Sequence, residues 1–140
     1  MDSEQERVRV VAELNRVRAL GCPCGGTYFG AVGPLGRDTR LDNAALWHCQ
    51  EMARRGLLDH TGLDGRDPFQ RIRSAGYTFR AAAENIASGN AGVVPTVQQL
   101  LNSPGHCQNI MSPLYTQVGV GHAISQSGQH FWTLDFAAPG

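Results

Sequence analysis

Apolar residues recur at helical spacing near the start of the chain, where Val10, Leu14 and Val17 lie three or four residues apart. The repeat follows Ser3 and Glu6, a pair typical of a capping box, and it stops at a glycine. This pattern predicts a first helix that begins at Ser3 and buries one side.

A second helix is predicted over residues 42–55, because one side of this stretch is apolar and a glycine follows it. Asp67 and Pro68 fit the cap and the first position of a third helix, which Gly76 ends. Residues 94–101 have the pattern of a fourth helix.

A short fifth helix is predicted to follow Ser103, whose hydroxyl can cap it, and Pro104 fits its first position. His106 then lies in the first turn, where the backbone amides disfavour positive charge, so its imidazole is expected to be neutral. Cys107 is its neighbour, but adjacent helical residues point in different directions. We therefore interpret Cys107 as a disulfide partner rather than a nucleophile activated by His106.

Three segments are predicted to be strands. Residues 77–83 continue into 84–87, and residues 117–125 and 129–137 flank a turn of serine, glutamine and glycine. Because the helices come first and the hairpin last, we expect an α+β fold in which helices cover a sheet. The sequence contains no internal repeat or linker, which predicts one domain over residues 1–140.

The composition of the chain excludes several classes of protein. The 140 residues are 41% hydrophobic, which is enough for a buried core, and no apolar run approaches the length of a membrane span. Twelve basic residues, all arginine, balance twelve acidic ones. Neither nucleic-acid binding nor attachment to a charged membrane surface is expected from this balance.

Four cysteines form an even set that fits two disulfides in a secreted protein or zinc in a cytosolic one. Only Cys22 and Cys24 come close to zinc-ligand spacing, and they are poorly placed to bond each other. Distant partners, and therefore an oxidising compartment, are favoured. Cys49 lies on the apolar side of its helix, where it could be a buried small hydrophobe or part of a disulfide.

The first residues are acidic and polar, unlike a signal peptide. This leaves two interpretations, a trimmed mature protein with an added methionine or a cytosolic protein. The cysteines favour the first, so we expect a secreted or periplasmic protein.

His60, Glu84 and His106 are the best candidates for chemistry. His60 lies on a predicted loop beyond a helix end, where functional groups are often displayed. Glu84 lies among alanine and isoleucine residues, where a carboxylate is costly to bury unless it is paired. The three could form a divalent-metal site or an acid–base pair, or they could only brace the fold.

The other histidines are weaker candidates. His48 is expected to be a surface or packing residue of the second helix, and His122 and His130 belong to the terminal hairpin, one face of which is expected to be solvated. Asp135, between two apolar residues, is expected to close a buried hydrogen bond.

Seven segments that occur in this order resemble the bacterial branch of the CAP superfamily, the SCP/PR-1-like domains. The segments are Leu58-Asp59-His60-Thr61, Asp67-Pro68-Phe69-Gln70-Arg71-Ile72, Gly76-Tyr77, Ala83-Glu84-Asn85-Ile86-Ala87, Asn102 to Met111, Val118-Gly119-Val120-Gly121 and Phe131-Trp132-Thr133-Leu134-Asp135-Phe136. The resemblance runs from the first helix to the end of the chain. It implies a three-layer α-β-α sandwich with a central, mainly antiparallel sheet and a surface cleft, in a secreted protein.

The resemblance also implies which residues form the functional site. His60 and His106 match the two cleft histidines, which can hold a divalent metal such as zinc, and Glu84 matches the first of two glutamates. The second glutamate falls near Ser103, so that carboxylate is absent. A bond between Cys24 and Cys107 is implied as well, which leaves Cys22 and Cys49 as a possible second pair.

Three functions follow from these residues. The first is a binding module whose cleft, formed by His60, Glu84, His106 and Ser103, takes a metal, a small apolar molecule, a lipid or a peptide. The second is a structural or interaction domain. The third is a metal-dependent hydrolase, such as a peptidase, in which Glu84 is the catalytic base and the two histidines hold the metal.

Overall fold

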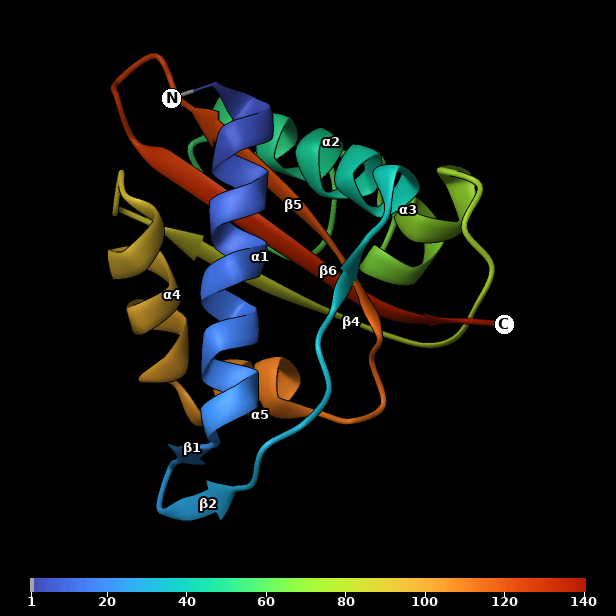
Figure 1. Cartoon of the computed structure of the whole chain (residues 1–140). Helices are drawn as coiled ribbons and strands as arrows, with labels where there is room; N and C mark the ends of the chain where they lie inside the picture. The colour runs from blue at the N-terminus through green and yellow to red at the C-terminus, as the bar shows by residue number, and fades with distance from the viewer. Residues whose placement is uncertain (1) are drawn as a thin grey trace.

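The computed structural model of the chain describes residues 2–140, which form five helices and six strands (Figure 1). The helices are α1 (Ser3–Leu20), α2 (Thr39–Arg55), α3 (Pro68–Ser74), α4 (Val93–Leu101) and α5 (Pro104–Met111). The strands are β1 (Cys22–Cys24), β2 (Thr27–Phe29), β3 (Gly36–Arg37), β4 (Phe79–Ser88), β5 (Gln117–Ile124) and β6 (His130–Pro139). Every helix and long strand predicted from the sequence is present.

The main sheet has the strand order β3-β5-β6-β4, and only the short β3–β5 pair is parallel. Helices α1, α4 and α5 lie on one face of this sheet, and α2 and α3 lie on the other (Figure 1). The expected three-layer α-β-α sandwich with a mainly antiparallel sheet is therefore confirmed. β1 and β2 form a separate hairpin beside α5.

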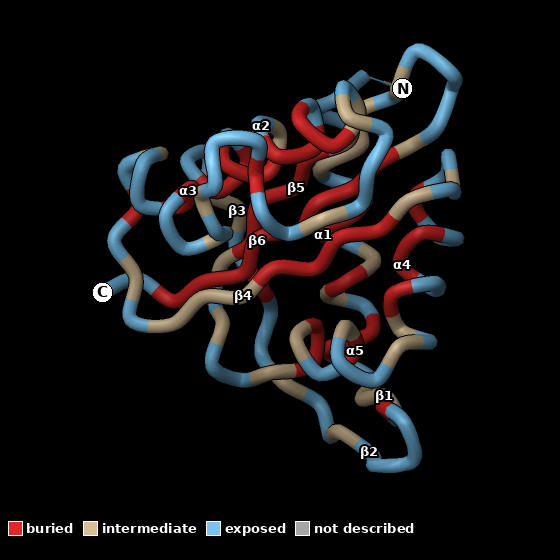
Figure 2. The backbone as a smooth tube through the Cα atoms, turned by 180° about the vertical axis from the view of Figure 1, so that it is seen from behind, coloured by how far each residue is buried: buried red, intermediate tan, exposed pale blue. Residues whose placement is uncertain are grey.

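Strand β6 lies between β5 and β4 and is buried along nearly its whole length (Figure 2). Trp132, Leu134 and Phe136 are buried against the α1, α4 and α5 side. Phe131 packs with residues of α2, and Thr133 accepts a hydrogen bond from the Cys49 thiol of α2 at 3.0 Å. Because side chains alternate along a strand, polar residues next to apolar ones in the sequence lie in different layers.

Two helix starts differ from the prediction. The capping box of α1 is formed by Asp2 and Gln5 rather than Ser3 and Glu6, because the Asp2 carboxylate accepts the Gln5 amide at 2.8 Å. Helix α2 begins earlier than predicted because Asp38 caps it. Among residues 2–140, no helix combines the length and the apolar character of a membrane span.

Candidate functional site

Glu84 lies on edge strand β4 and points into the layer of α2 and α3. Its side chain is 0% exposed and forms an ion pair with Arg71 of α3, whose Nη2 donates to both carboxylate oxygens at 2.9 and 2.8 Å. His60 Nδ1 lies 3.0 Å from Glu84 Oε1, and the His60 side chain is 50% exposed. Arg71 also donates to the carbonyl oxygens of His60 and Arg66, so one guanidinium holds both the loop and the carboxylate.

Two further ionisable side chains lie beneath this group. His48 is fully buried and its ring contacts the Asp59 carbonyl oxygen, so Nε2 carries the hydrogen. The same Nε2 lies 3.9 Å from Glu84. Burial is the largest cause that lowers the pKa of His48, which favours the neutral ring. Of the two roles expected for His48, surface or packing, the structure shows a buried packing residue, because the loop after α2 folds back over it.

Asp135 pairs with Glu84 across β4 and β6, and it is completely buried. Burial and the negative charge of Glu84 raise the pKa of Asp135 well above its usual value, so this carboxyl is held protonated. A side-chain hydrogen bond with Glu84 is a further cause of this raised pKa, so the buried hydrogen bond expected of Asp135 is one between two carboxyl groups.

Glu84 shows the opposite shift. Burial alone would raise its pKa, but the hydrogen bonds with His60 and Asp135 and the contacts with Arg71 outweigh burial and lower the pKa to about 2. Glu84 is therefore ionised at every physiological pH and is a weak base, since a general base works best with a pKa near the operating pH.

The raised pKa of Asp135 predicts a specific pH dependence. In the unfolded chain Asp135 loses its proton near the ordinary value of about 3.9, whereas the folded chain retains it, so raising the pH above that value destabilises the fold. Asp135→Asn removes this proton linkage while keeping the shape of the side chain. Its stability relative to the unmodified chain should therefore increase between pH 3.5 and pH 7. Urea unfolding across that range measures the difference in the free energy of unfolding. Parallel curves of this free energy against pH for the two proteins would contradict the prediction.

His106 approaches strand β4 from the opposite layer. Asn85 follows Glu84 and faces α5, where its amide donates to the His106 carbonyl oxygen at 3.0 Å. The His106 side chain is half-buried, and burial and the charge of nearby His60 lower its pKa. The neutral state expected for His106 thus has burial as its main cause. His60 and His106 approach edge strand β4 from its two sides, near enough for the charge of one to act on the other.

Ser103 occupies the cap position of α5, but its hydroxyl makes no capping hydrogen bond. Cys24 and Cys107 form a disulfide with a Cα–Cα distance of 5.5 Å, the pair that the family resemblance implied. The pair of Cys22 with Cys49 is not formed, and both are free thiols. The reason is spatial, because Cys49 is sealed between α2 and β6 whereas Cys22 lies near Cys107.

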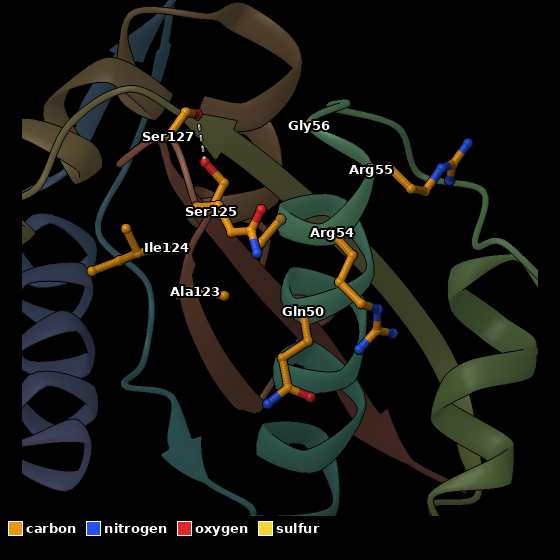
Figure 3. A pocket seen from close by; sticks show the side chains of 10 residues that line it. Gln50, Arg54, Arg55, Gly56, Ala123, Ile124, Ser125 and Ser127 are labelled. Atoms are coloured by element: carbon orange, nitrogen blue, oxygen red, sulfur yellow. Dashed lines mark hydrogen bonds between the residues drawn. The ribbon is translucent and has the colours of Figure 1, made fainter.

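A large hollow of about 820 Å³ lies elsewhere, between the end of α2 and the β5–β6 turn (Figure 3). Arg54 and Gln50 line it from α2, and Ser125 and Ser127 line it from the turn. Its lining includes neither His60 nor His106, so it is separate from the candidate site.

Sequence patterns alone missed Arg71 and His48 as site residues. The sequence contains only an indirect signal for Arg71, since a buried glutamate requires a cation nearby. The chain has twelve arginines, and their spacing does not indicate which of them pairs with Glu84. No sequence signal indicated that the loop would bury His48.

A model of the family described as CAP, the cysteine-rich secretory protein family, matches residues 14–136. The chain belongs to the CAP family. It is 35% identical over 103 residues to the uncharacterized protein YkwD of Bacillus subtilis. That match covers 74% of this chain and 39% of YkwD, so the CAP chain spans well under half of that relative.

Solved structures agree with the fold of this CAP chain. An outer surface protein of Borrelia burgdorferi has a TM-score of 0.84 at 20% identity, with 100% of this chain and 97% of that chain covered. An extracellular protein of Bacillus anthracis with an SCP domain has a TM-score of 0.79 at 22% identity, covering 96% and 40%. NaASP2, solved with Zn²⁺, has a TM-score of 0.70 at 14% identity, covering 96% and 80%.

Proposed function

We propose that this CAP domain acts outside the cytoplasm as a binding module, with His60 and His106 as the two protein ligands of a divalent metal such as zinc. The observation that carries the proposal is the contact between His60 Nδ1 and the Glu84 carboxylate. A histidine that donates one ring N–H to a carboxylate has its other nitrogen free and fixed in orientation, which is the usual arrangement of a metal-binding imidazole.

The chemistry of the remaining donors limits this site to two histidines. Arg71 occupies both oxygens of Glu84, so this carboxylate orients His60 and is not itself a ligand. Among residues 2–140 no group of three or more histidine, cysteine or acidic side chains is arranged to hold a metal ion. A pair of imidazole ligands that leaves the other coordination positions open fits an exchangeable metal better than a permanent structural one.

Relatives support both parts of the proposal. A structural neighbour of this chain was solved with Zn²⁺, and two others are described as an outer surface protein and an extracellular protein. A disulfide, such as Cys24–Cys107, is typical of proteins that fold in an oxidising compartment. Binding of a small apolar molecule, a lipid or a peptide stays a prediction from the family resemblance.

A hydrolase with Glu84 as its base is disfavoured. The carboxylate is buried, held by Arg71 and has a pKa of about 2, so it has little tendency to take a proton from water. The same contacts favour a structural part for Glu84, since they join β4, α3 and the His60 loop.

Zinc titration by calorimetry tests the metal site. The unmodified chain should bind about one equivalent of zinc, because the two histidines supply a single site. His60→Ala/His106→Ala should bind none there, while His130→Ala, in the distant hairpin, should bind as before. Equal binding by the double variant and the unmodified chain would contradict the shared site.

A further inference from the structure

Three of the four cysteines gather at one end of the molecule. β1 begins with Cys22 and ends with Cys24, and the β1–β2 hairpin lies beside α5, which carries Cys107 (Figures 1 and 2). Residues two apart in a strand point to the same side, so both β1 cysteines can face one helix. The fourth cysteine, Cys49, is buried on the other side of the sheet.

The free thiol of this cluster lies close to the disulfide. Cys22 Sγ is 3.9 Å from Cys107 Sγ, near the contact distance of two sulfur atoms, and it donates a hydrogen bond to the Pro23 carbonyl oxygen at 3.4 Å. Cys24 and Cys107 are 2% and 0% exposed, whereas Cys22 is partly exposed. Cys22 is therefore the member of the cluster that solvent reaches, and it lies beside a disulfide that solvent does not reach.

We propose that Cys22 is a thiol–disulfide exchange site, which opens the Cys24–Cys107 bond from within. The Cys22 thiolate attacks Cys107 Sγ, a Cys22–Cys107 bond forms, and the Cys24–Cys107 bond breaks. Cys24 leaves as a thiolate and takes up the proton that Cys22 released. The step is redox-neutral and needs no external oxidant or reductant.

The surrounding backbone suits such an exchange. The two β1 cysteines are separated by about 6.6 Å along the strand, and the hairpin turn at Gly25 and Gly26 is exposed. Gly25 lies so close to Pro104 that a Cβ there would come within 2.8 Å of the proline ring. This packing keeps the hairpin against α5 while the disulfide is open, so Cys107 stays within reach of both partners.

Counting free thiols in denaturant tests the proposal. Unmodified protein has two, Cys22 and Cys49. Cys24→Ser is refolded in a buffer of reduced and oxidised glutathione that forms the native bond in the unmodified protein. It should have one free thiol, because Cys22 then forms a disulfide with Cys107. The control Cys22→Ser/Cys24→Ser should have two. Three free thiols in folded Cys24→Ser would overturn the proposal.

A second measurement uses the unmodified protein and does not depend on the folding of a variant. After incubation at mildly alkaline pH, the protein is brought to mildly acidic pH in denaturant to stop exchange and expose every thiol. Free thiols are alkylated there with N-ethylmaleimide, which still reacts at that pH, and the site of alkylation is located by tandem mass spectrometry. The peptide between Arg18 and Arg37 contains both β1 cysteines, since the chain has no lysine for trypsin to cut. We expect a population alkylated at Cys24 instead of Cys22. Alkylation confined to Cys22 at all times would refute exchange. Neither measurement depends on zinc binding.

Discussion

Arg71→Met should lower the free energy of unfolding by about 3–5 kcal/mol, the usual cost of removing one partner of a buried ion pair. The side chains of Arg71 and Glu84 are 1% and 0% exposed, so the remaining carboxylate would stay out of water without a cation. It would also stay beside Asp135, which already requires a proton to be buried there. Urea unfolding at pH 7 measures the loss.

The control for this prediction is Arg73→Met on the same helix. Arg73 is exposed and lies over the Phe79 ring at 4.6 Å, a contact worth about 0.5–1 kcal/mol. The double variant Arg71→Met/Glu84→Leu should regain much of the stability lost by Arg71→Met, because it removes the unpaired charge as well. A double variant less stable than the single one would show that packing, and not charge, carries the effect.

Gly119→Ala should cost at least about 3 kcal/mol, at the upper end of what overpacking a core costs. Gly119 faces α2 so closely that a Cβ would lie 2.0 Å from the Leu41 carbonyl carbon and 2.3 Å from the Asp42 amide nitrogen. These are backbone atoms, so no change of side-chain rotamer relieves the clash and the helix itself must move.

The effect of Gly119→Ala has a matched control in Gly30→Ala, where an added Cβ meets nothing within 4 Å. This control should change stability by less than about 1 kcal/mol. Thermal unfolding followed by circular dichroism compares the two variants. Equal melting temperatures would show that α2 does not pack against Gly119 as closely as the distances to Leu41 and Asp42 indicate. Gly121, where an added Cβ would lie 2.5 Å from the Ala45 carbonyl carbon, should behave like Gly119.

The Val-Gly-Val-Gly stretch of β5, residues 118–121, shows how much of the structure can be predicted from sequence alone. Its valines identify a strand, and Val118 and Val120 are indeed buried in the α1 layer. The two glycines could equally have marked a bulge or a ligand contact. Only the packing of α2 onto the sheet shows that they make room for a helix, because a close approach between segments that are distant in the chain leaves no local pattern.

Local patterns by themselves determined the helices, the three long strands and the α+β class, because spacing, capping residues and turns act within a few residues. The ordered motifs also determined the family, and with it His60, Glu84 and His106 as the candidate site. Tertiary structure alone decided that Arg71 neutralises Glu84, that Asp135 is buried beneath it, and that Cys22 lies beside the disulfide. Burial and charge pairing depend on which distant segments meet across β4, and that is set by the packing of the layers rather than by residue spacing.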